Sequence, residues 1–137
     1  MITYKGGYKY RLIEDYSLQV PILNQHFDTE YILLTIDGLL KIKKNYAWDG
    51  PSGPTIDTHT FMRGSLVHDA LYQLMYDYGL DKKAHRKTAD KIMKTLCRED
   101  GMAWIRAWYC YFAVRIFGNL HASHPRSVKT APRKNKR

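Results

Sequence analysis

The sequence has little cysteine and no motif that would use it. Its 137 residues include two cysteines, Cys97 and Cys110, and neither lies in a CxxC pair or a Cys/His cluster. This excludes a disulfide-stapled miniprotein and a zinc module, and it fits a reducing compartment. The composition, 45% hydrophobic and 26% charged residues, also excludes a wholly disordered or collagen-like chain. The first residues, MITYKGGYKYRLIE, lack the apolar run of a secretory signal, so we expect intracellular synthesis.

Acidic residues are missing from the last third of the chain. All 13 of them lie at or before Asp100, so residues 1–100 carry a net charge of only +1, although the whole chain carries +9. The final segment, residues 121–137, has too little apolar content to fold alone. We therefore expect a single α+β domain over residues 1–120 and a basic tail over residues 121–137. The tail bases include Lys129, Arg133, Lys134, Lys136 and Arg137.

Residues 1–47 have the composition of β-strands, being rich in aromatic and β-branched residues. Strands are predicted over residues 8–13 and 16–22, and a hairpin over residues 31–36 and 39–44 with Asp37-Gly38 as a two-residue turn. Residues 48–60 begin with WDGPSGP, where two prolines and two glycines predict a loop. The N-terminal part is therefore expected to form an antiparallel sheet.

Residues 61–120 change to the periodicity of helices. One helix is predicted from about Phe61 to Tyr78, with Gly79 as the residue that ends it. A second helix runs to Glu99 with Asp81 as N-cap, and Gly101 follows it. These two helices form an antiparallel hairpin, followed by a third helix over about residues 102–117. The predicted architecture is a sheet followed by three helices.

The third helix is apolar almost all round and is interrupted only by Arg106 and Arg115. It is too short and too charged to predict a membrane span. We expect most of its aromatic residues to be core, because this helix must cover the helical hairpin. The alternative is a contact with an anionic lipid surface or another polyanion, since Trp and Arg suit a headgroup interface. That contact would use Trp104, Arg106, Trp108 and Arg115 with the tail bases, which could equally bind nucleic acid.

Four residues of the helical hairpin form a candidate site. His68 and Tyr72 are four residues apart and share one helix face. His68 lies 11 residues before Gly79, and Asp90 lies nine after Asp81, so the two are about 16 and 14 Å from the turn. They are therefore nearly level, and the carboxylate can hold one ring nitrogen of His68 as N–H. The other nitrogen is then free to act as a general base.

Asp69 points about 100° away from His68 and can serve a different partner, such as a cation. Calcium takes carboxylate and carbonyl oxygens, and the loop over residues 49–54 offers carbonyl groups.

The alternative without a catalytic site is a surface network, in which Arg86 and Lys94 form ion pairs with Asp90 on the same helix. His59, His68-Asp69 and Asp90 also follow the order of HD-type metal phosphohydrolases, but that fold is a larger helical bundle.

The HDALY segment at residues 68–72, the Ala89-Asp90 pair and the GPSG loop resemble the phospholipase A2 site, most closely the compact form of parvovirus capsid proteins. The resemblance covers residues 48–93. It implies that His68 is the general base, that Asp90 orients its imidazole and that Tyr72 hydrogen-bonds Asp90. It further implies that Asp69 and the carbonyls around Gly50 and Gly53 bind calcium.

Most of the chain also resembles an uncharacterised family of short phage proteins with a W/Y-x-DG-x-S-x-P loop and an HD-x-LY motif. Together the resemblances imply a calcium-dependent phospholipase A2-like hydrolase of glycerophospholipid esters, acting on an anionic phospholipid surface. Its expected location is the host cytoplasm or a virion. The alternative is a non-catalytic virion, tail-associated or host-interaction protein, whose tail contacts nucleic acid or other virion proteins.

Overall fold

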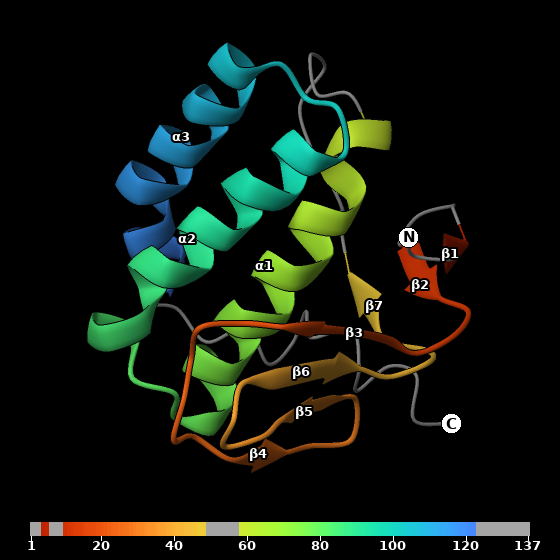
Figure 1. Ribbon diagram of the computed structural model, residues 1–137. Helices are drawn as coiled ribbons and strands as arrows, with labels where there is room; N and C mark the ends of the chain where they lie inside the picture. Colours follow the sequence, from red (N-terminus) through yellow and green to blue (C-terminus); the bar gives the residue numbers. More distant parts are fainter. Residues whose placement is uncertain (1–3, 6–9, 49–57, 123–137) are drawn as a thin grey trace. The chain divides into compact units, whose positions relative to one another are not determined.

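The structure is a computed structural model that describes residues 4–5, 10–48 and 58–122 (Figure 1). The described residues fall into two compact units, one that holds the strands and one that holds the helices. Antiparallel strands precede three helices along the chain, so the predicted α+β class is confirmed. The tail bases, Gly50 and Gly53 lie outside the described residues.

The strands form two small antiparallel sheets, with strand orders β1-β2-β7 and β3-β6-β5-β4. The second sheet is held by pairs such as Leu18 with Leu40 and Ile32 with Ile42. Alternate residues of β5 and β6 are buried, and Ile32, Leu34, Leu40 and Ile42 form part of the core of this unit. The strands are β1 (Tyr4–Lys5), β2 (Tyr10–Leu12), β3 (Tyr16–Gln19), β4 (Phe27–Asp28), β5 (Ile32–Leu34), β6 (Leu39–Ile42) and β7 (Ala47–Trp48).

The predicted hairpin is present between β5 and β6, but its turn is longer than expected. The Thr35 N–H donates to the Leu39 carbonyl at 3.0 Å, and the Gly38 N–H donates to the Thr35 carbonyl at 3.0 Å. Of the two expected turn residues, Gly38 alone has a positive φ, 89°. A two-residue turn of type I′ needs positive φ at both positions, so the chain instead uses the four residues Thr35–Gly38.

The helices begin and end near the predicted residues. Helix α1 (Thr58–Tyr78) is followed by Gly79 with φ 89°, and helix α2 (Lys82–Glu99) starts after Asp81, whose side chain accepts from the Lys83 N–H at 3.0 Å. These features confirm the predicted turn and N-cap. Helix α3 (Trp104–Ala122) starts two residues later than expected and is longer. Figure 1 shows α2 between α1 and α3.

The contact between α2 and α3 is made by small and flexible side chains. Met93 and Cys97 of α2 pack with Met102, Ala107 and Cys110. Both cysteines are free and buried, and burial raises the pKa of the Cys97 thiol to about 12. The face of α3 toward α2 therefore needs little aromatic volume.

The expectation that the aromatic residues of α3 are core is wrong for most of them. Tyr111 is buried, whereas Trp104, Trp108, Tyr109 and Phe112 are exposed. The physical reason is that Ala107, Cys110 and Gly118 lie on the buried face, where their small size lets α3 approach its neighbours closely. The large side chains are left on the opposite face.

Candidate functional site

His68 and Asp90 meet where the helical hairpin makes them level. The Nε2 atom of His68 on α1 lies 2.7 Å from Oδ1 of Asp90 on α2. The Asp90 side chain is fully buried, whereas 11% of the His68 side chain remains exposed. The turn at Gly79 and the cap at Asp81 set the register of the two helices, and the helical rise of about 1.5 Å per residue then brings these residues to the same level.

Tyr72 is the third member of the arrangement. Its hydroxyl donates to the same Oδ1 atom of Asp90 at 2.7 Å, and its ring lies 4.1 Å from the His68 ring, centroid to centroid. Burial and the neighbouring Asp90 charge raise the pKa of Tyr72, so it remains a neutral donor. One carboxylate oxygen of Asp90 therefore holds both the imidazole and the phenol.

The other carboxylate oxygen of Asp90 is held by arginine. Nη1 of Arg115 on α3 donates to Oδ2 at 2.9 Å, and Nη1 of Arg86 on α2 lies 3.7 Å from the same atom. Burial alone would raise the pKa of Asp90, but the contacts with His68, Tyr72 and Arg115 outweigh burial and lower it. Asp90 is consequently a carboxylate that joins side chains from all three helices.

Arg86 also fixes α3 through the backbone. Its Nη1 lies 3.3 Å from the Val114 carbonyl and 3.4 Å from the Arg115 carbonyl. Arg86 thus contacts the residue whose guanidinium binds the second oxygen of Asp90. The position of α3 and the orientation of Asp90 depend on the same contacts.

The interpretation of Asp90 as part of a surface network with Arg86 and Lys94 is wrong in two respects. Asp90 is fully buried rather than at the surface, and Lys94 does not pair with it, because the Lys94 ammonium lies 3.6 Å from the Trp108 ring centroid. Only the Arg86 contact of that interpretation is present. The sequence reasoning also missed Arg115 as a partner of Asp90. The available signal was the presence of two arginines in an otherwise apolar helix, since a charge in such a helix usually has a partner.

The arrangement can supply a base and positive charge. When the Nε2–H of neutral His68 donates to Asp90, the Nδ1 atom keeps a lone pair that can accept a proton. Arg86 and Arg115 exceed the single negative charge of Asp90, so these three groups carry a net charge of +1. The two guanidinium groups favour anionic substrates and developing negative charge, whereas the Asp69 carboxylate next to His68 offsets one of these positive charges unless it holds a cation.

The described residues do not by themselves fit the calcium site that the phospholipase resemblance implies. Asp69 is half-buried on α1, next to His68, whereas Gly50 and Gly53 are outside the described ranges. Within the ranges that the structure describes, no three His, Cys, Asp or Glu side chains are grouped to hold a metal. Calcium needs six to eight oxygen ligands, and Asp69 supplies at most two of them. Asp69 alone therefore does not make a calcium site, and the loop carbonyls that would complete the implied site lie outside the described residues.

The residues predicted to contact lipid or a polyanion are in different environments. Trp104 and Trp108 are exposed on α3, and Arg106 is half-buried on the same helix. Arg115 is partly exposed, with its Nη1 on Asp90. No helix among the described residues is long and apolar enough to cross a membrane.

A family model described as "Protein of unknown function (DUF1353)" matches residues 36–114, more than half of the chain. The chain belongs to this family. The DUF1353 match includes His68, Tyr72, Arg86 and Asp90 and ends one residue before Arg115. No curated protein and no solved structure matches the chain. Membership of DUF1353 thus assigns no chemistry, and the function has to be argued from the site.

Gly118 allows α3 to approach the site closely, and this gives a first prediction. A Cβ atom at this position would lie 2.7 Å from the Tyr72 hydroxyl and 3.3 Å from Nη1 of Arg86. We expect Gly118→Ala to lower the free energy of unfolding by about 1–3 kcal/mol in urea denaturation. Without this contact, alanine would stabilise the helix by up to about 1 kcal/mol, so a stabilised variant would contradict the packing.

The Tyr72→Phe variant supplies the control for Gly118→Ala. Removing the Tyr72 hydroxyl removes the closest atom to the new Cβ. The cost of Gly118→Ala should therefore be smaller in the Tyr72→Phe background by about 0.5 kcal/mol or more. Equal costs in both backgrounds would show that the two residues do not meet.

Proposed function

We propose that the protein is a phospholipase A2-like hydrolase of glycerophospholipid esters, in which His68 is the general base. The observation that supports this most is the Oδ1 atom of Asp90, which lies 2.7 Å from both His68 Nε2 and the Tyr72 hydroxyl. The resemblance of residues 48–93 implies the same pairing of roles. Asp90 and Tyr72 are positioning residues, because they act on the substrate only through His68.

In the proposed reaction, Nδ1 of His68 takes a proton from a water molecule that attacks the ester carbonyl. The C–O bond to the glycerol oxygen then breaks, and His68 returns the proton to that oxygen. The products are a fatty acid and a lysophospholipid, so the atoms of ester and water are all accounted for. Asp90 holds the ring in one orientation throughout and stabilises its protonated form.

The two arginines that contact Asp90 favour a phosphate-bearing substrate. Arg86 and Arg115 are 14% and 27% exposed, so their charges are screened less than those of free surface arginines. An ester next to a phosphodiester carries the negative charge that this environment attracts. This consideration supports a phospholipid over a neutral ester.

The direct test is hydrolysis of phosphatidylglycerol vesicles by the full chain, with lysophospholipid and fatty acid measured by mass spectrometry. The proposal predicts both products in equal amounts. It also predicts calcium dependence, because calcium at Asp69 and carbonyls of residues 49–54 would stabilise negative charge on the carbonyl oxygen. Loss of hydrolysis in a chelator is expected. Calcium-independent turnover would remove the metal from the proposal, and absence of both products under all conditions would overturn it.

A further inference from the structure

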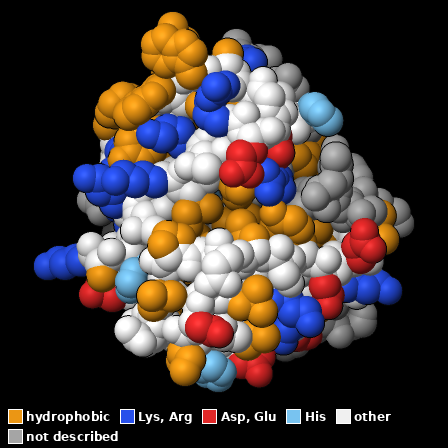
Figure 2. Space-filling view, viewed as in Figure 1, with side chains coloured by type: hydrophobic (Ala, Val, Ile, Leu, Met, Phe, Trp, Pro, Cys, Tyr) orange, Lys and Arg blue, Asp and Glu red, His pale blue; other side chains and the backbone are white. Residues whose placement is uncertain are grey.

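The outward face of α3 is the largest apolar feature that the candidate site does not use. Six large side chains on this helix are between 41% and 71% exposed. At about 100° per residue they span an arc of about 140° on one side of the helix. Figure 2 shows hydrophobic side chains gathered at the upper left of the view, where Figure 1 places α3, with basic side chains beside them. We call this surface the α3 face, and it consists of Trp104, Ile105, Trp108, Tyr109, Phe112 and Ile116.

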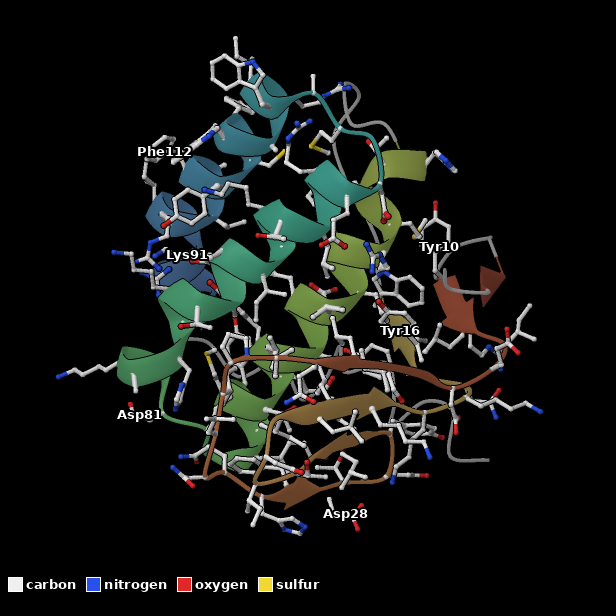
Figure 3. All side chains as sticks on the ribbon, in the orientation of Figure 1. Tyr10, Tyr16, Asp28, Asp81, Lys91 and Phe112 are labelled. Atoms are coloured by element: carbon white, nitrogen blue, oxygen red, sulfur yellow. The ribbon has the colours of Figure 1, made fainter. Side chains whose placement is uncertain are left out.

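Basic residues accompany the α3 face. The Lys94 ammonium of α2 lies over the Trp108 ring, 3.6 Å from its centroid. Lys91, one helical turn before Lys94 on α2, is exposed and lies on the same side of the view in Figure 3 as Phe112. Arg106 and Arg115 are on α3 itself, and residues 101–122 contain no acidic residue. The surface is therefore both apolar and positively charged.

We propose that the α3 face docks on an anionic lipid bilayer, with the helix lying in the plane of the interface. Trp and Tyr place apolar rings among acyl chains and polar edges at the headgroups, and Lys and Arg reach the lipid phosphates. A second copy of the chain fits the face poorly, because a symmetric contact would bring like charges together.

Docking is independent of catalysis by His68, although the two are connected in the fold. Arg115 of α3 donates to Asp90, so the helix that contacts the bilayer also holds one side of the candidate site. The bilayer would supply phospholipid next to that helix. Binding and hydrolysis are nevertheless separate measurements, and each can fail without the other.

Tryptophan fluorescence reports this docking directly. Trp104 and Trp108 are 62% and 41% exposed, whereas Trp48, the third tryptophan of the chain, is 2% exposed. Adding phosphatidylglycerol vesicles should shift the emission to shorter wavelength and protect it from acrylamide. Phosphatidylcholine vesicles should bind more weakly, and salt should weaken binding to the anionic vesicles. An unchanged spectrum with phosphatidylglycerol vesicles overturns the proposal.

A matched pair of double variants tests where the bilayer binds. Ile105→Asp with Tyr109→Asp places two charges on the α3 face and should reduce partitioning to phosphatidylglycerol vesicles at least about 100-fold. Leu23→Asp with Ile36→Asp is the control, since these residues are 54% and 62% exposed in the strand unit. The control should bind within about threefold of the unchanged chain. Circular dichroism and thermal unfolding establish that both variants are folded.

The remaining outcomes also decide the question. Equal binding by the α3 variant and the unchanged chain would assign binding to the basic tail and overturn docking by α3. A dimer in the absence of lipid that the α3 substitutions dissociate, with no vesicle binding, would make the face a protein interface. Vesicle binding without hydrolysis would support docking while overturning the proposed function. Hydrolysis of a dispersed short-chain phospholipid without vesicle binding would do the reverse.

Discussion

Replacing His68 by glutamine is expected to lower the rate of vesicle hydrolysis by about 10²- to 10⁴-fold. The glutamine amide can still donate to Oδ1 of Asp90, which lies 2.7 Å from His68 Nε2. It offers no nitrogen lone pair to accept a proton from water. The variant therefore removes the base and keeps a donor to the buried carboxylate. The measurement is the initial rate of lysophospholipid release at saturating vesicle concentration.

The control for His68→Gln is the same substitution at His85, a half-buried residue of α2 to which we assign no role. His85→Gln should hydrolyse vesicles at the rate of the unchanged chain. Both variants should keep the α3 face, so their vesicle binding should be unchanged. Equal rates in the His68 variant and the unchanged chain would show that His68 is not the base.

Replacing Asp90 by asparagine is expected to have the largest effect on stability. Asp90 is fully buried and is the carboxylate that Arg115 and Arg86 contact at 2.9 and 3.7 Å. Removing one partner of a buried ion pair leaves the other charge uncompensated, which costs about 3–5 kcal/mol of unfolding free energy. Urea denaturation near pH 7 measures this loss. The hydrolysis rate should also fall, because His68 loses the acceptor that fixes its orientation.

Asp28→Asn is the control, because Asp28 forms an exposed ion pair with Lys43 at 3.2 Å. Such surface pairs contribute about 0–1 kcal/mol, so this variant should be close to the unchanged chain. If both aspartate variants lost the same small amount, the network around Asp90 would contribute no more than a surface pair.

The pH dependence of Asp90→Asn follows from the lowered pKa of Asp90. Its folded pKa lies below the ordinary aspartate pKa of 3.8, so its charged form stabilises the fold above that pH. This stabilisation is lost as the pH falls through the lower, folded pKa. The difference in unfolding free energy between the unchanged chain and Asp90→Asn should therefore be largest near neutral pH and should narrow below about pH 4. A difference that widened on acidification would contradict the assignment.

The pairing of His68 with Asp90 could be predicted from the sequence because it depends on few variables. Gly79 and Asp81 mark the turn, and helical rise converts residue counts into nearly equal distances. Tyr72 follows from the same geometry, since it lies one turn from His68. Local signals of this kind define the two helices and hence the face they share.

Arg115 and the α3 face could not be placed in the same way. Arg115 is 25 residues from Asp90 and belongs to a different helix, so its partner depends on how α3 packs on α2. The packing is decided by small residues such as Ala107 and Gly118. In the sequence, the many aromatic residues of α3 suggest a different buried face. An apolar helix with little periodicity does not reveal which side is buried.

The contact between Arg115 and Asp90 sets a lower limit on any minimal fragment of this protein. A peptide restricted to the segment that resembles phospholipase A2, or cut at the end of the DUF1353 match, would omit Arg115. The second oxygen of a carboxylate that is fully covered in the intact chain would then be left with Arg86 alone at 3.7 Å. Excising the two-helix hairpin would therefore retain Tyr72 and Asp90, the two residues that contact the imidazole, while losing the guanidinium group that holds the other oxygen of Asp90.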